Sequence, residues 1–238
     1  MIRLAALQLD ALRLRLEQYS RVQINDFLLP AAANTLAQAA AQANFCLSLN
    51  SGDKPIDLAL HELATLTDAQ QQQLTSLIHD GARRGFQYCF ETCRLSELAD
   101  SGAEPAGPLL DFYQAMNSDS VLSALRLLSA DQTLAFSDAQ ITRYRPGHFL
   151  TEHDDNVKHK NRRLAFVLNL TPAWRADWGG LLTFHDGNGR ISECFVPTFN
   201  TLSIFKVPQI HSVSYVTPFA GTNRISITGW IRRYAEGS

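Results

Sequence analysis

Residues 180–216 read GLLTFHDGNGRISECFVPTFNTLSIFKVPQIHSVSYV, and this stretch decides the fold class. It consists of short apolar or alternating runs that are separated by turn-forming residues, which is typical of successive β-strands. The segment Asp186-Gly187-Asn188-Gly189 predicts a hairpin connection. Runs of the same kind occur on both sides of the quoted stretch. The expected strands are 140–144, 163–170, 180–185, 191–196, 201–206, 211–216 and 223–232.

So many short strands within 139–232 predict a sandwich or barrel, most economically a double-stranded β-helix, the jelly roll. The first half of the chain differs, because helical windows at 31–41, 68–84 and 118–128 alternate there with short extended runs. Those extended runs are 21–27, 45–49 and 86–90. We therefore expect a mainly β protein with supporting helices.

The two halves of the chain are expected to form one domain over 1–238, because no linker composition separates them. In this interpretation, 1–138 is a support region of helices and strands, and 139–232 is the jelly-roll core that carries the functional site.

The composition indicates an ordinary globular protein. Of the 238 residues, 45% are hydrophobic and 18% are charged, and the formal net charge of −2 gives no bulk attraction to nucleic acid or to an anionic membrane. No apolar run is long enough to span a bilayer and no signal-peptide pattern opens the chain, so we expect a cytoplasmic protein. Free buried thiols are expected at the cysteines, which form no Cys-x-x-Cys pair: Cys46, Cys89, Cys93 and Cys194.

A candidate metal site is formed by His153, Asp155 and His211. A His-x-Asp triplet alone is a weak signal, since it arises often by chance in solvated loops. His211 strengthens it, because it begins another expected strand, and strands far apart in sequence become neighbours in a jelly roll. Two histidines and one carboxylate form the facial triad that suits non-haem Fe(II) and leaves open positions for an organic acid and O₂.

The last expected strand contains an arginine that can bind the carboxylate of such an organic acid. Alternation along 223–232 places Arg224, Ser226 and Thr228 on one face and Ile225 and Ile227 on the other. The planar guanidinium of Arg224 matches a carboxylate, and Ser226 can add a hydroxyl bond on the same side. An arginine inside a barrel is costly without an anion.

These residues belong to a series of motifs that resembles a known family, the 2-oxoglutarate- and Fe(II)-dependent dioxygenases. Within it the sequence is most similar to the prolyl 4-hydroxylase branch, and there to the ribosomal prolyl hydroxylase subgroup. The resemblance covers about 139–232, where the motifs occur in the order of the family. They are YRPGHFLTEHDD at 144–155, RLAFVLNL at 163–170, WGGLL at 178–182, Pro197, Phe205, HSV at 211–213 and RISITGW at 224–230.

The resemblance implies a role for each matching residue. His153, Asp155 and His211 would bind iron, and Arg224 would pair with the C5 carboxylate of 2-oxoglutarate. Tyr144 would donate a hydroxyl bond near the same cosubstrate, with Ser226 or Thr228 as secondary contacts. The family often has a tyrosine on the strand after His-x-Asp, where Leu168 and Asn169 stand here.

The reaction that the resemblance implies is hydroxylation of a prolyl residue in a protein, with decarboxylation of 2-oxoglutarate to succinate. Its cofactors would be Fe(II), 2-oxoglutarate and O₂, with ascorbate as a supporting reductant. The substrate protein would be ribosomal or related to translation, without sequence-specific nucleic-acid binding. Two alternatives remain open, namely a dioxygenase for a free amino acid or small metabolite, and a non-catalytic jelly-roll binding module.

Several other polar residues near these motifs are expected to have structural roles. His148, His159 and His185 are interpreted as turn caps or exposed residues. Asp154 is expected to face away from the metal or to guard the substrate entrance. Trp174 and Trp178 are interpreted as packing residues, with the alternative that an aromatic ring near the mouth holds a proline ring. The basic cluster after the triplet is interpreted as a solvated loop, with the alternative that it steers a partner attached to an RNA-rich assembly: Lys158, Lys160, Arg162 and Arg163.

Overall fold

The computed structural model describes residue 2 and residues 8–52, 54–100 and 107–235. Its strands are β1 (Arg21–Ile24), β2 (Cys46–Ser51), β3 (Lys54–Ala59), β4 (Tyr88–Arg94), β5 (Phe136–Tyr144), β6 (Phe149–His153), β7 (Arg162–Asn169), β8 (Leu182–His185), β9 (Ile191–Phe195), β10 (Thr201–Lys206), β11 (His211–Val213) and β12 (Arg224–Arg232). Its α-helices are α1 (Leu9–Tyr19), α2 (Pro30–Ala41), α3 (Leu60–Leu63), α4 (Asp68–Arg84), α5 (Leu95–Asp100), α6 (Pro108–Met116) and α7 (Asp119–Ser129).

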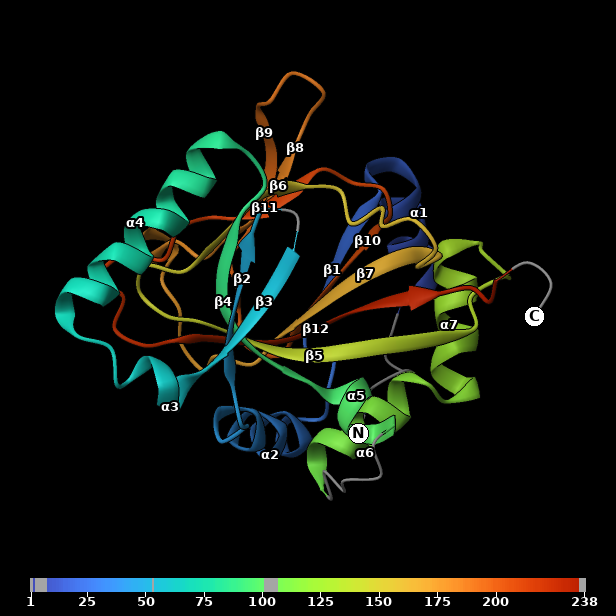
Figure 1. Ribbon diagram of the computed structural model, residues 1–238. Helices are drawn as coiled ribbons and strands as arrows, with labels where there is room; N and C mark the ends of the chain where they lie inside the picture. The colour runs from blue at the N-terminus through green and yellow to red at the C-terminus, as the bar shows by residue number, and fades with distance from the viewer. Residues whose placement is uncertain (1, 3–7, 53, 101–106, 236–238) are drawn as a thin grey trace.

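The strands form one antiparallel sheet that curls into a half-barrel (Figure 1). Its order is β1-β10-β7-β12-β5-β4-β6-β11-β8-β9, and β2 joins it by pairing with β4 and β3. The sheet therefore turns at β4, which pairs with β2 along one edge and, along the other edge, with β5 at its C-terminal end and with β6 at its N-terminal end. This architecture confirms the jelly-roll fold with supporting helices.

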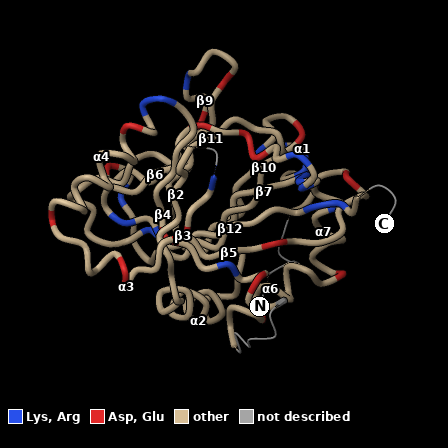
Figure 2. Tube along the Cα trace, in the orientation of Figure 1, with Lys and Arg blue, Asp and Glu red and all other residues tan. Residues whose placement is uncertain are grey.

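The helices cover the outside of the larger half of the sheet. Helices α5 and α6 contact β5, α2 contacts β12, and α1 contacts β1 and α7. Helix α4 packs against β2 and β4 at the opposite end of the molecule (Figure 1). Charged residues of both signs lie over the surrounding helices and loops (Figure 2).

Alternation along the central strands separates the hydrophobic core from the interior of the barrel. On β5, Ala139 and Ile141 are buried in the core beneath the helices, whereas Gln140, Thr142 and Tyr144 line a cleft on the concave face. Because side chains of a strand point to opposite faces in turn, one strand can build both the core and the site.

The expected strands and helices are present, with shifted ends. Alternation did not reveal β6, because its sequence FLTEH has no regular apolar pattern, yet this strand carries His153. Helices α1, α3, α5 and α6 and the β3 strand were also missed.

The four cysteines are free, as expected, but their predicted burial is only partly correct. Cys89 and Cys93 are buried, Cys46 is half-buried, and Cys194 is exposed. Cys194 lies on β9, which has a single neighbour in the sheet and exposes most of its residues, so the prediction of a buried thiol there was wrong. None of the helices in the described part of the chain is long and apolar enough to cross a membrane.

Candidate active site

Pairing of two strands brings the candidate metal ligands together. His153 ends β6 and His211 begins β11, and the two residues are direct partners in the antiparallel pair. Their ring centroids are 4.1 Å apart. Asp155 follows β6 by two residues, and one ligand atom from each of the three side chains lies within 4.8 Å of the other two. The expected proximity of these three residues is therefore found in the structure.

Both histidine rings are oriented by hydrogen bonds at their Nδ1 atoms. Nδ1 of His153 lies 3.0 Å from the Thr151 carbonyl oxygen, and Nδ1 of His211 lies 2.7 Å from that of Gln209. Because a carbonyl oxygen only accepts, each Nδ1 donates and each Nε2 keeps its lone pair free. The two Nε2 atoms each lie 3.5 Å from a different carboxylate oxygen of Asp155.

The backbone turns Asp155 back toward the histidines. Its φ of +62° lies in the left-handed region, which aspartate tolerates better than most residues. Burial raises the pKa of Asp155, but the two imidazoles beside it outweigh burial and hold the pKa at about 2. Burial lowers the pKa of His211 to about 4. The Asp155 carboxylate and the Nε2 atom of His211 are thus deprotonated at neutral pH, as metal binding requires.

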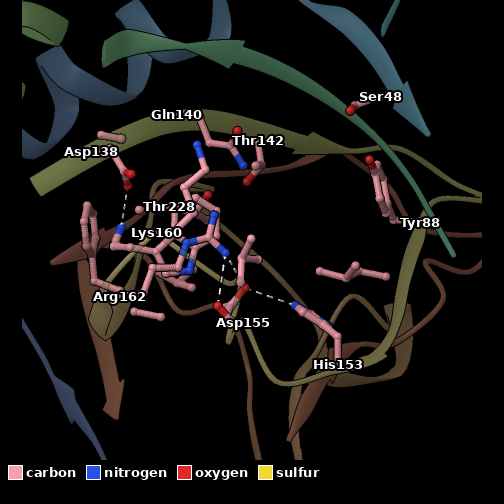
Figure 3. A pocket seen from close by; sticks show the side chains of 18 of the residues that line it. Ser48, Tyr88, Asp138, Gln140, Thr142, His153, Asp155, Lys160, Arg162 and Thr228 are labelled. Carbon is pink, nitrogen blue, oxygen red and sulfur yellow. Dashed lines mark hydrogen bonds and ion pairs between the residues drawn. The ribbon is translucent and has the colours of Figure 1, made fainter. Parts of the chain in front are cut away.

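Arg162 completes the surroundings of Asp155 (Figure 3). Its Nη1 lies 3.3 Å from the Asp155 carbonyl oxygen and 3.4 Å from a carboxylate oxygen of the same residue. Its guanidinium carbon lies 3.5 Å above the Trp230 ring. Interpreting Arg162 as part of a solvated loop was therefore wrong, whereas Lys158 and Lys160 are exposed as expected.

The metal ligands open into a cleft of about 1270 Å³ on the concave face of the sheet. Arg224 lies in this cleft and is only 2% exposed. Neither its Nε nor its Nη1 has a hydrogen-bond partner in the described structure, and burial lowers the pKa of its guanidinium. A buried cation with unused donors is expensive, so the site requires an anion.

Thr228 lines the cleft with Arg224, as alternation predicts, and Tyr144 lines the same cleft. Tyr144 pairs with Arg224 across β5 and β12, and the guanidinium lies 5.2 Å from the centre of its ring. Ser226 is fully buried, and its hydroxyl lies 3.1 Å from that of Thr142, which does line the cleft. Thr142, which the sequence did not single out, thus stands nearer the cleft than Ser226.

The glycine pair after Trp178 lets the chain pass close to this pocket. Gly179 has a φ of +72°, and a Cβ atom there would lie 2.0 Å from the carbonyl oxygen of Tyr215. Gly180 has a φ of +61°, and its Cβ would lie 3.4 Å from Cδ of Arg224. Both positions therefore require the conformational freedom and small size of glycine.

The remaining residues considered from the sequence lie away from the metal ligands or have structural contacts. His159 is exposed, and Asp154 is exposed but lines the same cleft as the metal ligands. His185 is not a turn cap, because its Nε2 lies 2.9 Å from the hydroxyl of Ser212 on the neighbouring strand. His148 is half-buried, and burial lowers its pKa.

The two residues that stand in place of the family's tyrosine are both buried. Leu168 packs in the core beneath the helices. Asn169 donates from Nδ2 to the Thr201 carbonyl oxygen at 3.3 Å, whereas its Oδ1 has no hydrogen-bond partner in the described structure.

Comparisons with known sequences agree with this site. Residues 139–232 match the family model of the 2OG-Fe(II) oxygenase superfamily. The prolyl 3-hydroxylase OGFOD1 of Mus musculus is 31% identical in an alignment of 146 positions that covers 50% of this chain and 26% of that protein. Its Xenopus laevis counterpart is 35% identical over 116 residues, 46% of this chain and 22% of that protein. The chain thus spans about a quarter of the length of these curated relatives.

Solved structures share the fold. A Pseudomonas putida prolyl-4-hydroxylase superposes with a TM-score of 0.62 at 20% identity, over 96% of this chain and 100% of that chain. A Trichoplax adhaerens prolyl hydroxylase, solved with a peptide of the hypoxia inducible factor oxygen degradation domain, gives a TM-score of 0.63 at 15% identity, over 94% and 89% of the two chains.

The fold and the site of residues 139–232 agree with the match of this region to the 2OG-Fe(II) oxygenase superfamily. The curated relatives that the chain resembles are prolyl hydroxylases, the branch that the sequence motifs indicate. The residues present fit the two groups that this superfamily uses. The two imidazoles and the carboxylate supply a donor set suited to Fe(II), and the unpartnered guanidinium of Arg224 suits a carboxylate of 2-oxoglutarate.

Proposed function

We propose that this protein is a 2-oxoglutarate- and Fe(II)-dependent dioxygenase that hydroxylates a prolyl residue of a protein. One observation carries the proposal: a metal-binding triad and a buried, unpartnered arginine share a single cleft. The triad alone would suit many metalloproteins. The arginine adds the need for a small anion beside the metal, which a 2-oxo dicarboxylate meets.

Each residue has a defined role in this proposal. His153, Asp155 and His211 hold the iron, Arg224 pairs with the C5 carboxylate of 2-oxoglutarate, and Tyr144 contacts the same molecule. Thr228 is a secondary contact. Ser226 acts indirectly, because its hydroxyl contacts that of Thr142, which lines the cleft. The support for these roles is the proximity of the three ligand atoms, the unused donors of Arg224, and the positions of the residues on the cleft wall.

When bound, iron and 2-oxoglutarate supply the oxidation, in which one atom of O₂ enters a C–H bond and the other enters succinate as CO₂ is released. The chain itself binds the iron and the 2-oxoglutarate and orients them. The Nδ1 bonds of His153 and His211 keep both rings turned toward Asp155, so the ligand geometry is fixed before the metal arrives. Apolar wall residues such as Val167 and Phe205 keep water away from the inner cleft.

The test is succinate release from 2-oxoglutarate in the presence of Fe(II), O₂ and ascorbate. Purified protein is assayed with and without prolyl peptides derived from ribosomal and other translation proteins, and each peptide is analysed by mass spectrometry for one added oxygen atom on proline. Peptide-dependent turnover is the expected result. No turnover and no binding of 2-oxoglutarate by protein with verified iron loading would refute the proposal.

The size of the cleft favours a polypeptide over a free amino acid or small metabolite. Its volume of about 1270 Å³ exceeds the roughly 300–1,000 Å³ of typical small-molecule sites. A non-catalytic binding module is disfavoured because all three ligands and the arginine are retained in one arrangement.

The proposal extends to the cellular setting and the organisation of the chain. A ribosomal or translation-related substrate and a cytoplasmic location follow from the resemblance to ribosomal prolyl hydroxylases, and the free cysteines are in keeping with a reducing compartment. We also propose that 1–238 acts as one catalytic unit. Residues of β2 and β4, from the N-terminal half, line the same cleft as the iron ligands, which supports this view.

A further inference from the structure

The strand pair that carries the two histidine ligands is short and irregular. Strand β11 has three residues, and its register with β6 shifts between His211 and Val213. Two residue pairs align the strands, His211 with His153 and Val213 with Leu150. A shift of this kind interrupts the ladder of backbone hydrogen bonds. Beside the ligands, the backbone therefore provides few hydrogen bonds that could fix the distance between the two imidazoles.

Three polar side chains lie on the other face of the same part of the sheet, where β6, β11 and β8 are neighbours (Figure 1). Glu152 immediately precedes one histidine ligand on β6, and Ser212 immediately follows the other on β11. His185 ends β8, the second neighbour of β11. None of the three lines the cleft, as expected for residues that alternate with cleft-facing ones. We name Glu152, His185 and Ser212 the outer bridge.

The imidazole of His185 connects the two ligand strands. Its Nε2 lies 2.9 Å from the hydroxyl oxygen of Ser212 on β11. Its Nδ1 lies 3.6 Å from a carboxylate oxygen of Glu152 on β6. That Nδ1 is buried and has no hydrogen-bond partner in the described structure, so a small movement of the exposed Glu152 side chain would satisfy it. The ring thus stands between the residue before one ligand and the residue after the other.

Several contacts hold His185 in this place. Its backbone N–H donates to the carbonyl oxygen of Ile210 at 3.0 Å, just before β11 begins. Its Nε2 also lies 3.3 Å from the hydroxyl oxygen of Thr183, which in turn donates to the Ser212 carbonyl oxygen at 3.3 Å. Only 12% of the His185 side chain is exposed. The imidazole is therefore a fixed part of the sheet rather than a mobile surface group.

We propose that the outer bridge fixes the spacing of the two histidine ligands, with His185 as its central residue. This inference rests on the proposed function, because it takes the metal ligands from there, and it adds residues from the opposite face of the sheet. His185 touches neither metal nor cosubstrate in this arrangement, so it is a positioning residue. Groups that orient metal ligands from outside the coordination sphere change metal affinity by about 10- to 100-fold when they are removed.

The test measures metal binding without turnover. The affinity for Mn(II) is obtained from the electron paramagnetic resonance signal of the free ion, and the ligand geometry from the d–d absorption of protein loaded with Co(II). His185→Leu is expected to weaken Mn(II) binding about 10-fold and to change the Co(II) spectrum. His185→Gln is expected to restore most of the affinity and the wild-type spectrum, because its side-chain amide can still hydrogen-bond the Ser212 hydroxyl.

Two more variants separate the outer bridge from a general loss of stability. Ser212→Ala removes the same contact with a smaller change, and its loss of affinity should not add to that of His185→Leu in the double variant. It also decides the matter if urea unfolding shows that metal-free His185→Leu does not fold. His79→Leu is the matched control, because His79 is another half-buried histidine and its ring lies 6.1 Å from that of Phe149 on β6. This control should bind Mn(II) like the wild type.

Two results would overturn the inference: wild-type Mn(II) affinity and Co(II) spectrum in folded His185→Leu and Ser212→Ala, or a loss of affinity in His79→Leu as large as that in His185→Leu. Either result leaves metal binding and succinate release by the wild type unaffected. Conversely, a wild-type protein that binds no metal and releases no succinate would refute the proposed function, so the two failures can be told apart.

Discussion

Replacing Arg224 with methionine separates the need for an anion from the stability of the fold. Without cosubstrate, the wild type holds a 2% exposed guanidinium whose Nε and Nη1 have no hydrogen-bond partner in the described structure. Exchanging a buried charged group for an apolar one of similar volume is often neutral or stabilising by about 1–4 kcal/mol. We therefore expect Arg224→Met to unfold at the same temperature as the wild type or at a higher one.

Addition of 2-oxoglutarate should reverse that order. At 100 times its dissociation constant, a ligand stabilises the protein that binds it by about 2.7 kcal/mol. Loss of one partner of a buried charge pair costs about 3–5 kcal/mol, which weakens binding more than 100-fold and removes this stabilisation from the variant.

The assay is thermal unfolding with and without 2-oxoglutarate, accompanied by titration calorimetry. Arg175→Met makes the same chemical change at an exposed position and should leave both the unfolding temperature and the response to 2-oxoglutarate as in the wild type. The reasoning is refuted if Arg224→Met is several kcal/mol less stable than the wild type and still binds 2-oxoglutarate with unchanged affinity.

Three further predictions concern the metal ligands, a glycine and an ion pair. Asp155→Ala should abolish Mn(II) binding in equilibrium dialysis while Asp154→Ala leaves it largely intact; equal losses would mean that the carboxylate is misassigned. Gly179→Ala should lower the free energy of unfolding by more than about 1 kcal/mol in urea titrations, since its φ is +72° and the Tyr215 carbonyl occupies the space, and an unchanged midpoint would contradict this. Hydrogen bonds from Thr133 and Arg163 outweigh burial and lower the pKa of Asp131, so its stabilisation is present above the unfolded pKa of about 3.9 and is lost as the pH falls through the folded value. The stability difference between wild type and Asp131→Ala should therefore shrink below about pH 4; a constant difference from pH 7 to pH 3 would exclude this cause.

Sequence patterns were sufficient for the parts of the site that follow strand alternation. Tyr144, Arg224 and Thr228 occupy the concave face because side chains alternate along β5 and β12. The proximity of His153 and His211 follows from the jelly-roll order of strands, which the motifs indicate.

Alternation could not identify Arg162, because the register between β12 and β7 shifts beside it. Arg232 pairs with Arg162 after Ile231 pairs with Leu164, so Arg163 is left out of the ladder. A regular strand with Ala165 and Val167 facing the cleft would place Arg163, not Arg162, on that face. Because of the bulge, Arg162 faces the cleft and Arg163 faces away from it, where Arg163 forms an ion pair with Asp131.

The ring contacts of Phe86 and Phe90 were also beyond the sequence patterns. The run 86–90 predicts a strand, but nothing in it says that β5 and β6 pair with successive parts of one edge of this strand. Only that pairing brings Phe86 against His153 and Phe90 against Tyr144. Contacts of this kind depend on the order of strands in space rather than on local sequence.

The most direct test of the central claim is a crystal structure with Mn(II) and 2-oxoglutarate. We predict one anomalous metal peak within bonding distance of Nε2 of His153, Nε2 of His211 and a carboxylate oxygen of Asp155, with the C5 carboxylate of 2-oxoglutarate paired to Arg224. A metal bound by other side chains, or a 2-oxoglutarate molecule that leaves the guanidinium unpaired, would contradict the account.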